Sequence, residues 1–306
     1  MVNAARKKHQ NNRIRPSLFD RVFDWINLSM IFLVFLIIAY PLLFVVSASF
    51  SDPILVSSGK VLLFPKGITV EGYQKIFESK EIWHSFLNSV QYTFIGTTLN
   101  VVLTVMGAYP LSRRDLVGRK PISLLLTFTM YFSGGMIPSF LVVKLLGLYN
   151  TFWSLIIPGA VSAYNLIVMR SFFETSIPEE LHDAAKIDGC TDYQYLLRIL
   201  LPLSKPVLAV MVLFYGTGHW NAFFNAIIYL RNADMYPLQV VLRNILLKNI
   251  LSDNMITDFG GAANYSHTSE IIKYGLIIVS SIPMIIVYPF VQKHFVKGVM
   301  IGSIKG

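Results

Sequence analysis

The chain has 306 residues, of which 54% are apolar and only 14% are charged. A soluble domain of this length carries nearer a quarter charged residues, so the composition excludes an ordinary soluble protein and indicates one that spans a membrane. The formal net charge is +9. The basic residues flank apolar segments instead of alternating with exposed aromatic residues, which argues against a nucleic-acid surface.

Six apolar segments, nearly free of charge, reach or almost reach the roughly 20 residues that a bilayer core requires. They cover about 25–50, 84–110, 121–146, 150–171, 206–230 and 273–292. We therefore expect an all-α membrane protein with a basic cytoplasmic tail over 1–24, a six-helix transmembrane domain over 25–292 and a cytoplasmic C-terminal tail over 293–306.

The distribution of lysine and arginine predicts the orientation of these spans. If both chain ends lie inside, 17 of the 26 basic residues fall in cytoplasmic segments. Positive charge is enriched on the cytoplasmic side of membrane proteins, and the opposite topology would reverse the ratio. The sequence therefore predicts an N-in, C-in protein.

The segment between the first two spans contains turn signals at Pro53 and Gly67, followed by a short interfacial helix over 67–77. The second span is unusually polar. Polar groups in lipid are costly unless they face a partner or water, although helix packing alone would explain the threonines. The polar residues of this span are Asn88, Gln91, Thr93, Thr97, Thr98, Asn100 and Thr104.

Spans three and four are joined by a short outer turn over 147–150. Pro138 follows two glycines in the third span, and Pro158 precedes Gly159 in the fourth. Proline frees a backbone carbonyl and small residues allow close helix approach, so both spans are expected to be kinked.

A polar segment over 176–206 separates the fourth span from the fifth. Ser176 and Glu179 have the spacing of a capping box, with Pro178 in the first helical turn. Gly189 is suited to the left-handed conformation that ends a helix. The pattern predicts a first helix that stops at Gly189.

A second helix is predicted directly after this glycine. Thr191 and Gln194 offer another capping box, and Pro202 and Pro206 are expected to end the helix. A helix–Gly–helix hairpin on the cytoplasmic side of a multi-span protein is a docking element. An ordinary solvated loop, the alternative, would not need two caps and a hinge.

The order of residues in this hairpin resembles the EAA loop of bacterial ABC importer permeases. Asp183 stands where that loop usually has glutamate, which keeps the charge and shortens the reach. The resemblance implies contact with an ATPase subunit and a loop over 174–206. The residues expected to make the contact are Glu180, Asp183, Ala184, Ala185, Gly189, Ile199, Leu201 and Pro202.

The fifth span carries the residues best suited to a sugar pathway. Aromatic faces stack on pyranose rings and amides bond to hydroxyls, so Tyr215, Trp220, Asn221 and Asn225 are candidates. Trp220 could instead belong to an interfacial aromatic belt. His219 is expected to be a packed, neutral residue.

Several motifs do not occur in the sequence. It has no G-x-x-x-x-G-K-[ST] phosphate loop, no H-E-x-x-H and no clustered Cys/His spacing, so neither a metal nor a cofactor is expected. Charged residues are almost absent inside the spans, which argues against an ion-coupled carrier. A membrane enzyme would need a catalytic cluster at a span end, and none is evident. The energy for any transport must therefore come from another subunit.

A wider resemblance covers most of the chain. It includes the stretches 134–138, 169–173, 236–238 and 295–298, and it is to the maltose-type carbohydrate permeases, in the branch associated with complex oligosaccharides. A type I ABC importer permease fold is implied, without enzymatic activity of its own. The implied partners are a homologous second permease, an ATPase dimer, an extracytoplasmic solute-binding protein and membrane lipid.

The same resemblance implies that the C-terminal tail reaches the ATPase, with Lys297 and Gly298 as contact residues. The expected substrate is a carbohydrate, in particular an oligosaccharide, carried across the bacterial cytoplasmic membrane. A permease of the same fold for another polar solute, such as a glycerol-phosphate-type substrate, is the alternative. A secondary sugar carrier would show an internal repeat of spans, and none is convincing here.

Overall fold

The computed structural model describes residues 17–255 and 263–302, and every regular element in these ranges is helical. The long helices are α1 (Leu18–Ser49), α4 (Lys80–Ser112) and α14 (Ala263–Gly302). The others are α2 (Pro53–Ser57), α3 (Glu71–Glu78), α5 (Arg119–Tyr131), α6 (Met136–Leu145), η1 (Phe152–Leu155), α7 (Ala163–Ser176), α8 (Glu179–Ile187), α9 (Asp192–Tyr195), η2 (Leu196–Leu200), α10 (Leu201–Leu203), α11 (Lys205–Trp220), α12 (Phe224–Tyr229), η3 (Ala233–Met235) and α13 (Leu238–Met255).

Three helices in the described residues are long and apolar enough to cross a membrane: α1, α4 and the part of α14 over 272–290. Two further crossings are possible if bent helix pairs count as one span each. α5 and α6 meet at 116°, and the 192–203 helical segment meets α11 at 82°. The described chain therefore contains three to five candidate spans, where six spans were predicted.

The predicted fourth span over 150–171 is wrong as a single helix. The structure has the short 3-10 helix η1 there and then an irregular stretch, and α7 starts only at Ala163. The reason is local: Pro158 and Gly159 fall in the irregular stretch, and Ser162 caps the new helix by accepting from the Asn165 N–H.

The third and fifth predicted spans are also interrupted. The third is broken at 132–135, where Gly135 has φ +85°, a value that glycine adopts without strain. The fifth is broken at 221–223, between α11 and α12. The kink predicted for the third span thus occurs as a complete break, and the break in the fifth span was not predicted.

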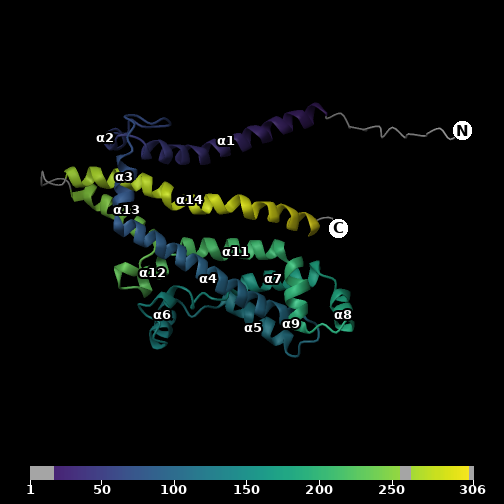
Figure 1. Cartoon of the computed structure of the whole chain (residues 1–306). Coiled ribbons are helices and arrows are strands. Elements are labelled where there is room, and N and C mark those ends of the chain that lie inside the picture. Colours follow the sequence, from purple (N-terminus) through teal and green to yellow (C-terminus); the bar gives the residue numbers. More distant parts are fainter. Residues whose placement is uncertain (1–16, 256–262, 303–306) are drawn as a thin grey trace.

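The helix α4 lies at the centre of the bundle and packs against α7, α11 and α13, whereas α1 contacts α14 along the edge of the molecule (Figure 1). The largest buried cluster joins α4, α7, α11 and the polar hairpin through residues such as Ala108, Met169, Ala185 and Met211. The hairpin is therefore built onto the main core of the protein.

Polar side chains of α4 bond to backbone groups in the segment 234–238, between α12 and the start of α13. Asn88 Nδ2 donates to the carbonyls of Asp234 and Tyr236 at 2.6 and 3.2 Å, and Tyr92 Oη donates to the Met235 carbonyl at 3.0 Å. Ser89 Oγ accepts from the Leu238 N–H at 2.8 Å. Polar residues of the second predicted span thus face protein, as the cost of polar groups in lipid requires.

A second set of such contacts lies deeper along the same helix. Asn100 Nδ2 donates to the Gly159 carbonyl at 3.4 Å and lies 3.0 Å from His219 Nε2. Because the amide nitrogen is a donor, His219 Nε2 acts as acceptor, which agrees with a packed, uncharged histidine. Thr104 Oγ1 and Tyr215 Oη are 2.7 Å apart and join α4 to α11.

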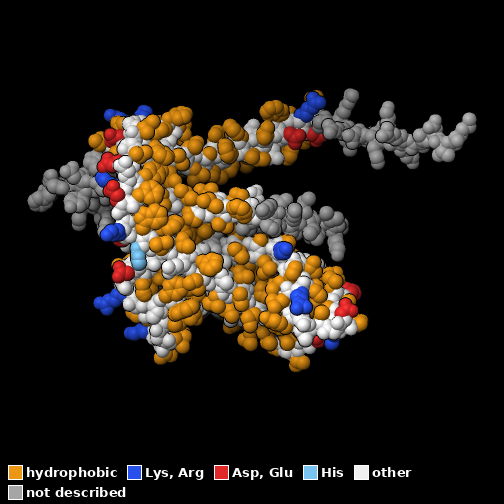
Figure 2. Space-filling model, in the orientation of Figure 1, with side chains coloured by type: hydrophobic (Ala, Val, Ile, Leu, Met, Phe, Trp, Pro, Cys, Tyr) orange, Lys and Arg blue, Asp and Glu red, His pale blue; other side chains and the backbone are white. Residues whose placement is uncertain are grey.

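The surface separates into an apolar middle and two charged ends. Figure 2 shows hydrophobic side chains across the centre of the molecule, with Lys, Arg, Asp and Glu gathered toward opposite ends. The N-terminal end of α1, the last turns of α14 and the helices α8 and α9 lie at the same end (Figure 1). An apolar middle between charged ends is the arrangement that a membrane-spanning protein requires.

The close contact between α4 and α11 can be tested at Gly96. A Cβ added there would lie 2.5 Å from His219 Nε2, so Gly96→Ala should overpack the contact at a cost of about 1–3 kcal/mol and lower the Tm in detergent. Gly218→Ala is the matched control because no atom lies within 4 Å of its added Cβ. Equal Tm values for both variants would contradict this packing.

Candidate functional site

The polar segment between α7 and α11 forms a helical hairpin. α8 ends in a left-handed glycine, with Gly189 at φ +77°. The Cys190 N–H donates to the Ala185 carbonyl at 2.9 Å and the Gly189 N–H to the Lys186 carbonyl at 3.1 Å, the bond pattern of a Schellman motif. The predicted stop at Gly189 is confirmed.

Of the two predicted capping boxes, only the second one forms. Thr191 caps α9 and Gln194 bonds back to the Thr191 N–H. The first is wrong: Ser176 is the last residue of α7, and Pro178 precedes α8 without a side-chain cap. The physical reason is the proline, which forces Ile177 into the extended region and ends α7 there.

The prolines do not end the second helix as predicted. Helical structure continues from Asp192 through η2, a π-helical turn, to Leu203, and it includes the exposed Pro202. The break comes at Ser204, whose hydroxyl donates to the Leu200 carbonyl at 2.7 Å. Pro206 lies in the first turn of α11, where its missing N–H has no cost.

The two alanines of the resemblance have different environments. Ala185 is 5% exposed and lies in the main core beside Phe173 and Ile177. Ala184 is exposed, as are Glu180 and Asp183 on the same helix. The small side chain of Ala185 thus lets α8 pack closely against the core. Ala184 leaves room for a partner to approach the exposed surface beside Glu180 and Asp183.

The exposed side of α8 also carries an apolar residue that the sequence analysis missed. Ile187 is 87% exposed, directly before the turn at Gly189. The sequence did contain a signal for this residue, because an apolar side chain stands two positions before the glycine that ends the helix. In the second half of the hairpin, Ile199 and Leu201 are partly buried and pack against the core, so they support the hairpin from behind.

A buried histidine ties the two arms of the hairpin together. His182 Nε2 donates to Asp192 Oδ1 at 3.1 Å, and its ring meets Tyr195 edge to face at 4.9 Å. The pKa of Asp192 is held below its usual value, mainly by this hydrogen bond. Burial raises the pKa of the Tyr195 hydroxyl. The angle between α8 and α9 is therefore fixed by side chains as well as by the glycine.

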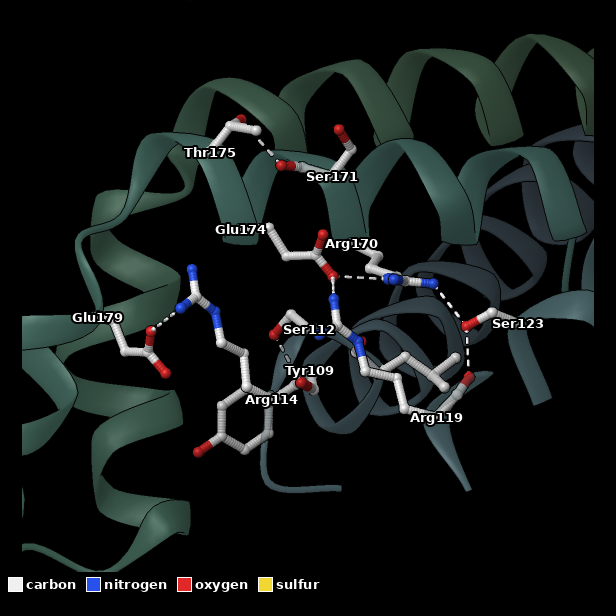
Figure 3. Close-up of polar contacts among 11 residues, drawn as sticks. Tyr109, Ser112, Arg114, Arg119, Ser123, Arg170, Ser171, Glu174, Thr175 and Glu179 are labelled. Atoms are coloured by element: carbon white, nitrogen blue, oxygen red, sulfur yellow. Dashed lines mark hydrogen bonds and ion pairs between the residues drawn. The ribbon is translucent and has the colours of Figure 1, made fainter. Parts of the chain in front are cut away.

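The base of the hairpin is held by an ion-pair cluster, shown in Figure 3. The carboxylate of Glu174 at the end of α7 accepts from both Arg119 and Arg170, the latter at 2.7 Å. Arg170 also donates to Ser123 Oγ at 2.6 Å, and Arg119 Nε donates to the Leu111 carbonyl at 3.0 Å. One carboxylate thus joins α7 to α5 and to the end of α4.

A second pair connects the loop after α4 to the hairpin itself. Arg114 Nη1 lies 3.2 Å from Glu179 Oε2 in the first turn of α8. The two ion-pair groups border a cavity of about 530 Å³ whose lining also includes Tyr109 and His182. Sequence reading missed this arrangement, although the basic run over 113–120 and the i,i+4 pair Arg170–Glu174 signalled it.

The candidate pathway residues fall into two groups. Tyr215 and Trp220 are 6% and 3% exposed, so the expectation that they face a water-filled path does not hold in this structure. Tyr215 Oη accepts from the Ser162 N–H at 3.2 Å, and Trp220 Nε1 donates to the Ser280 carbonyl at 2.9 Å. Both aromatic rings are used in packing because their polar atoms find partners in neighbouring segments.

The two asparagines, in contrast, are exposed at the break between α11 and α12. Asn221 Nδ2 donates to the Thr217 carbonyl at 3.0 Å, which leaves its amide oxygen available. Lys297 and Gly298 lie in the last turns of α14, and their side-chain environment is outside the described part of the structure. Within the described residues, no group of three His, Cys, Asp or Glu side chains could hold a metal ion.

The fold and the hairpin define a helical membrane component with an exposed helical hairpin at one end. Residues 101–301 match the family described as "Binding-protein-dependent transport system inner membrane component". The chain belongs to this family, and it is a permease component of a transport system.

Relatives with established names extend the match over nearly the whole chain. The chain is 44% identical to the polygalacturonan/rhamnogalacturonan transport system permease protein YtcP of Bacillus subtilis (strain 168), over 94% of this chain and 99% of that protein. It is 41% identical to the protein LplC of the same organism, over 94% of this chain and 96% of that protein.

A solved structure has the same fold. The crystal structure of a bacterial ABC transporter involved in the import of the acidic polysaccharide alginate contains a chain that is 35% identical and superposes with a TM-score of 0.83. The match covers 91% of this chain and 98% of that chain.

The shared carboxylate at the base of the hairpin provides a test. Glu174→Gln should leave two neighbouring guanidinium groups without a counter-charge and destabilise the protein by about 1–3 kcal/mol, read as a lower Tm. Asp115→Asn is the control. The Asp115 side chain is exposed, so its ion pair with Arg113 should contribute only about 0–1 kcal/mol to the free energy of unfolding. If Asp115→Asn lowers the Tm as much as Glu174→Gln does, the cluster has no special structural role.

Proposed function

We propose that the chain is the permease subunit of an ABC importer and that the hairpin over 174–206 docks on the ATPase. The observation that carries this proposal is the exposed side of α8. It presents the acidic Glu180 and Asp183, the small Ala184 and the apolar Ile187 on a helix that is fixed to the core. A rigid helix with an apolar residue among charges fits a groove on a partner protein.

The proposed topology has both chain ends and the hairpin in the cytoplasm, in a bacterial cytoplasmic membrane. Six crossings remain the proposal, with the third, fourth and fifth formed by broken helices. In membrane transporters, helix breaks at bilayer depth are tolerated where they are buried in protein or line a cavity. The breaks at 132–135, 156–162 and 221–223 are therefore compatible with crossings that move during transport.

Three protein partners belong to the proposal: a homologous second permease, an ATPase dimer and an extracytoplasmic solute-binding protein. The description of the family as dependent on a binding protein supports the last of these. Glu180, Asp183, Ala184 and Gly189 are proposed to contact the ATPase directly. Ala185, Ile199 and Leu201 would position them, and the exposed Pro202 borders the contact.

The proposed substrate is an oligosaccharide. The names of two similar proteins mention polygalacturonan/rhamnogalacturonan transport and alginate import, both of carbohydrate chains. Asn221 and Asn225 are proposed to face the translocation path, because their exposed amides can bond to sugar hydroxyls. The C-terminal residues Lys297 and Gly298 are proposed to reach the ATPase as well.

ATPase docking can be tested with two glycines of matched geometry. Gly189 and Gly59 have φ +77° and +69°, and no atom lies within 4 Å of an added Cβ at either. An arginine at either site therefore meets the same backbone strain. Gly189→Arg should lower co-purification of the ATPase on the order of tenfold, equivalent to about 1.4 kcal/mol, whereas Gly59→Arg should not. Equal loss, or no loss, would contradict docking through the hairpin.

The pathway residues can be tested by cysteine accessibility after Cys190→Ser removes the single native thiol. Asn221→Cys and Asn225→Cys in the assembled transporter should react with a water-soluble maleimide. Tyr215→Cys should not react, because that position is 6% exposed. If neither asparagine position reacts in any transport state, the asparagines do not line the path.

A further inference from the structure

A second hollow lies on the opposite side of the ion-pair cluster from the hairpin cavity. It is a crevice of about 770 Å³. The loop after α4 and the first turns of α5 form most of its lining, and Arg170 in the middle of α7 completes it. Four cationic side chains line it, Arg114, Arg119, Lys120 and Arg170, together with the apolar Leu116 and Leu124. None of its lining residues is acidic.

The charges around this crevice do not cancel. Glu174 is the only carboxylate in ion-pair contact with Arg119 and Arg170 among the described residues, and Glu179 pairs with Arg114. The Lys120 side chain is exposed and takes part in no hydrogen bond or ion pair with the described residues. Two carboxylates thus face four cations, and the surplus positive charge favours an anionic ligand.

The start of α5 adds to the same electrostatic preference. Gly118 precedes the helix without a side-chain cap, and its first turn contains no acidic residue. The partial positive charge of this helix terminus is therefore left without a counter-charge, next to Lys120.

On one side, the crevice continues into an exposed apolar face of α5. Leu124 is 72% exposed at its edge, and Leu125 and Phe128 further along α5 are 64% and 53% exposed. A cationic pocket that continues into an exposed apolar helix face matches an amphiphile with a charged headgroup and acyl chains. A free phosphate ion would use only the cationic part.

We propose that this crevice binds the phosphate headgroup of an anionic phospholipid from the cytoplasmic leaflet. The proposal takes the cytoplasmic location of the crevice from the topology given under the proposed function. The cytoplasmic leaflet is rich in anionic lipid. Lys120 would contact the phosphate directly, with Arg119 and Arg170 behind it. Since these two arginines also hold Glu174 at the base of the hairpin, lipid occupancy would stiffen the support of the docking element.

The test measures lipid retained by the purified transporter complex, using native mass spectrometry after reconstitution with phosphatidylcholine and phosphatidylglycerol. Wild type should retain phosphatidylglycerol in preference to phosphatidylcholine. Lys120→Gln should weaken retention about fivefold, the factor expected for one basic residue near a membrane surface. Lys120→Arg should retain wild-type binding. Lys144→Gln, the same charge change on α6 away from the crevice, should retain it as well.

Three results would overturn the proposal. Equal loss in Lys120→Gln and Lys144→Gln would show only general charge attraction. Displacement of the lipid by inorganic phosphate at low concentration would show an ion site. Photo-crosslinking from position 124 to the second permease instead of to lipid would show that protein covers the crevice. Lipid retention does not depend on ATPase docking, so its failure is distinguishable from failure of the proposed function.

Discussion

The fold depends on one constraint, which is that backbone groups freed by helix breaks must find partners away from water. The central helix α4 meets this requirement with its polar side chains. Asn88, Ser89 and Tyr92 bond to the backbone of the 234–238 segment, and Asn100 bonds to the Gly159 carbonyl. The broken helices can exist because α4 is polar on the side that faces them.

The helix α4 also connects the helical bundle to the hairpin. Its last turns carry Ala108 and Leu111, which pack in the cluster that includes Ala185 of the hairpin. The loop that follows supplies Arg114, which pairs with Glu179 at the start of α8. Arg119, the first residue of α5, pairs with Glu174 at the end of α7. Under the proposed function, a displacement of α8 by a docked partner would therefore be passed to α4, α5 and α7 together.

The two hollows on either side of Glu174 have opposite character. The one beside the hairpin mixes acidic and basic side chains, whereas the lining of the other contains cations, uncharged polar residues and apolar residues but no carboxylate. Arg119 and Arg170 line the second hollow and also bond to Glu174, so the second hollow and the base of the hairpin share two side chains. Protein docking and lipid binding would thus act on one ion-pair cluster.

Local chemistry determined much of this protein from sequence alone: the helical membrane class, the stop at Gly189 and the cap at Thr191. Those features depend on neighbours within a few residues. The tertiary structure decided the rest. Tyr215 and Trp220 became packing residues because Thr104 and Ser280 lie opposite them. The cluster around Glu174 unites residues about 50 positions apart, and no local pattern encodes which of several charges will meet.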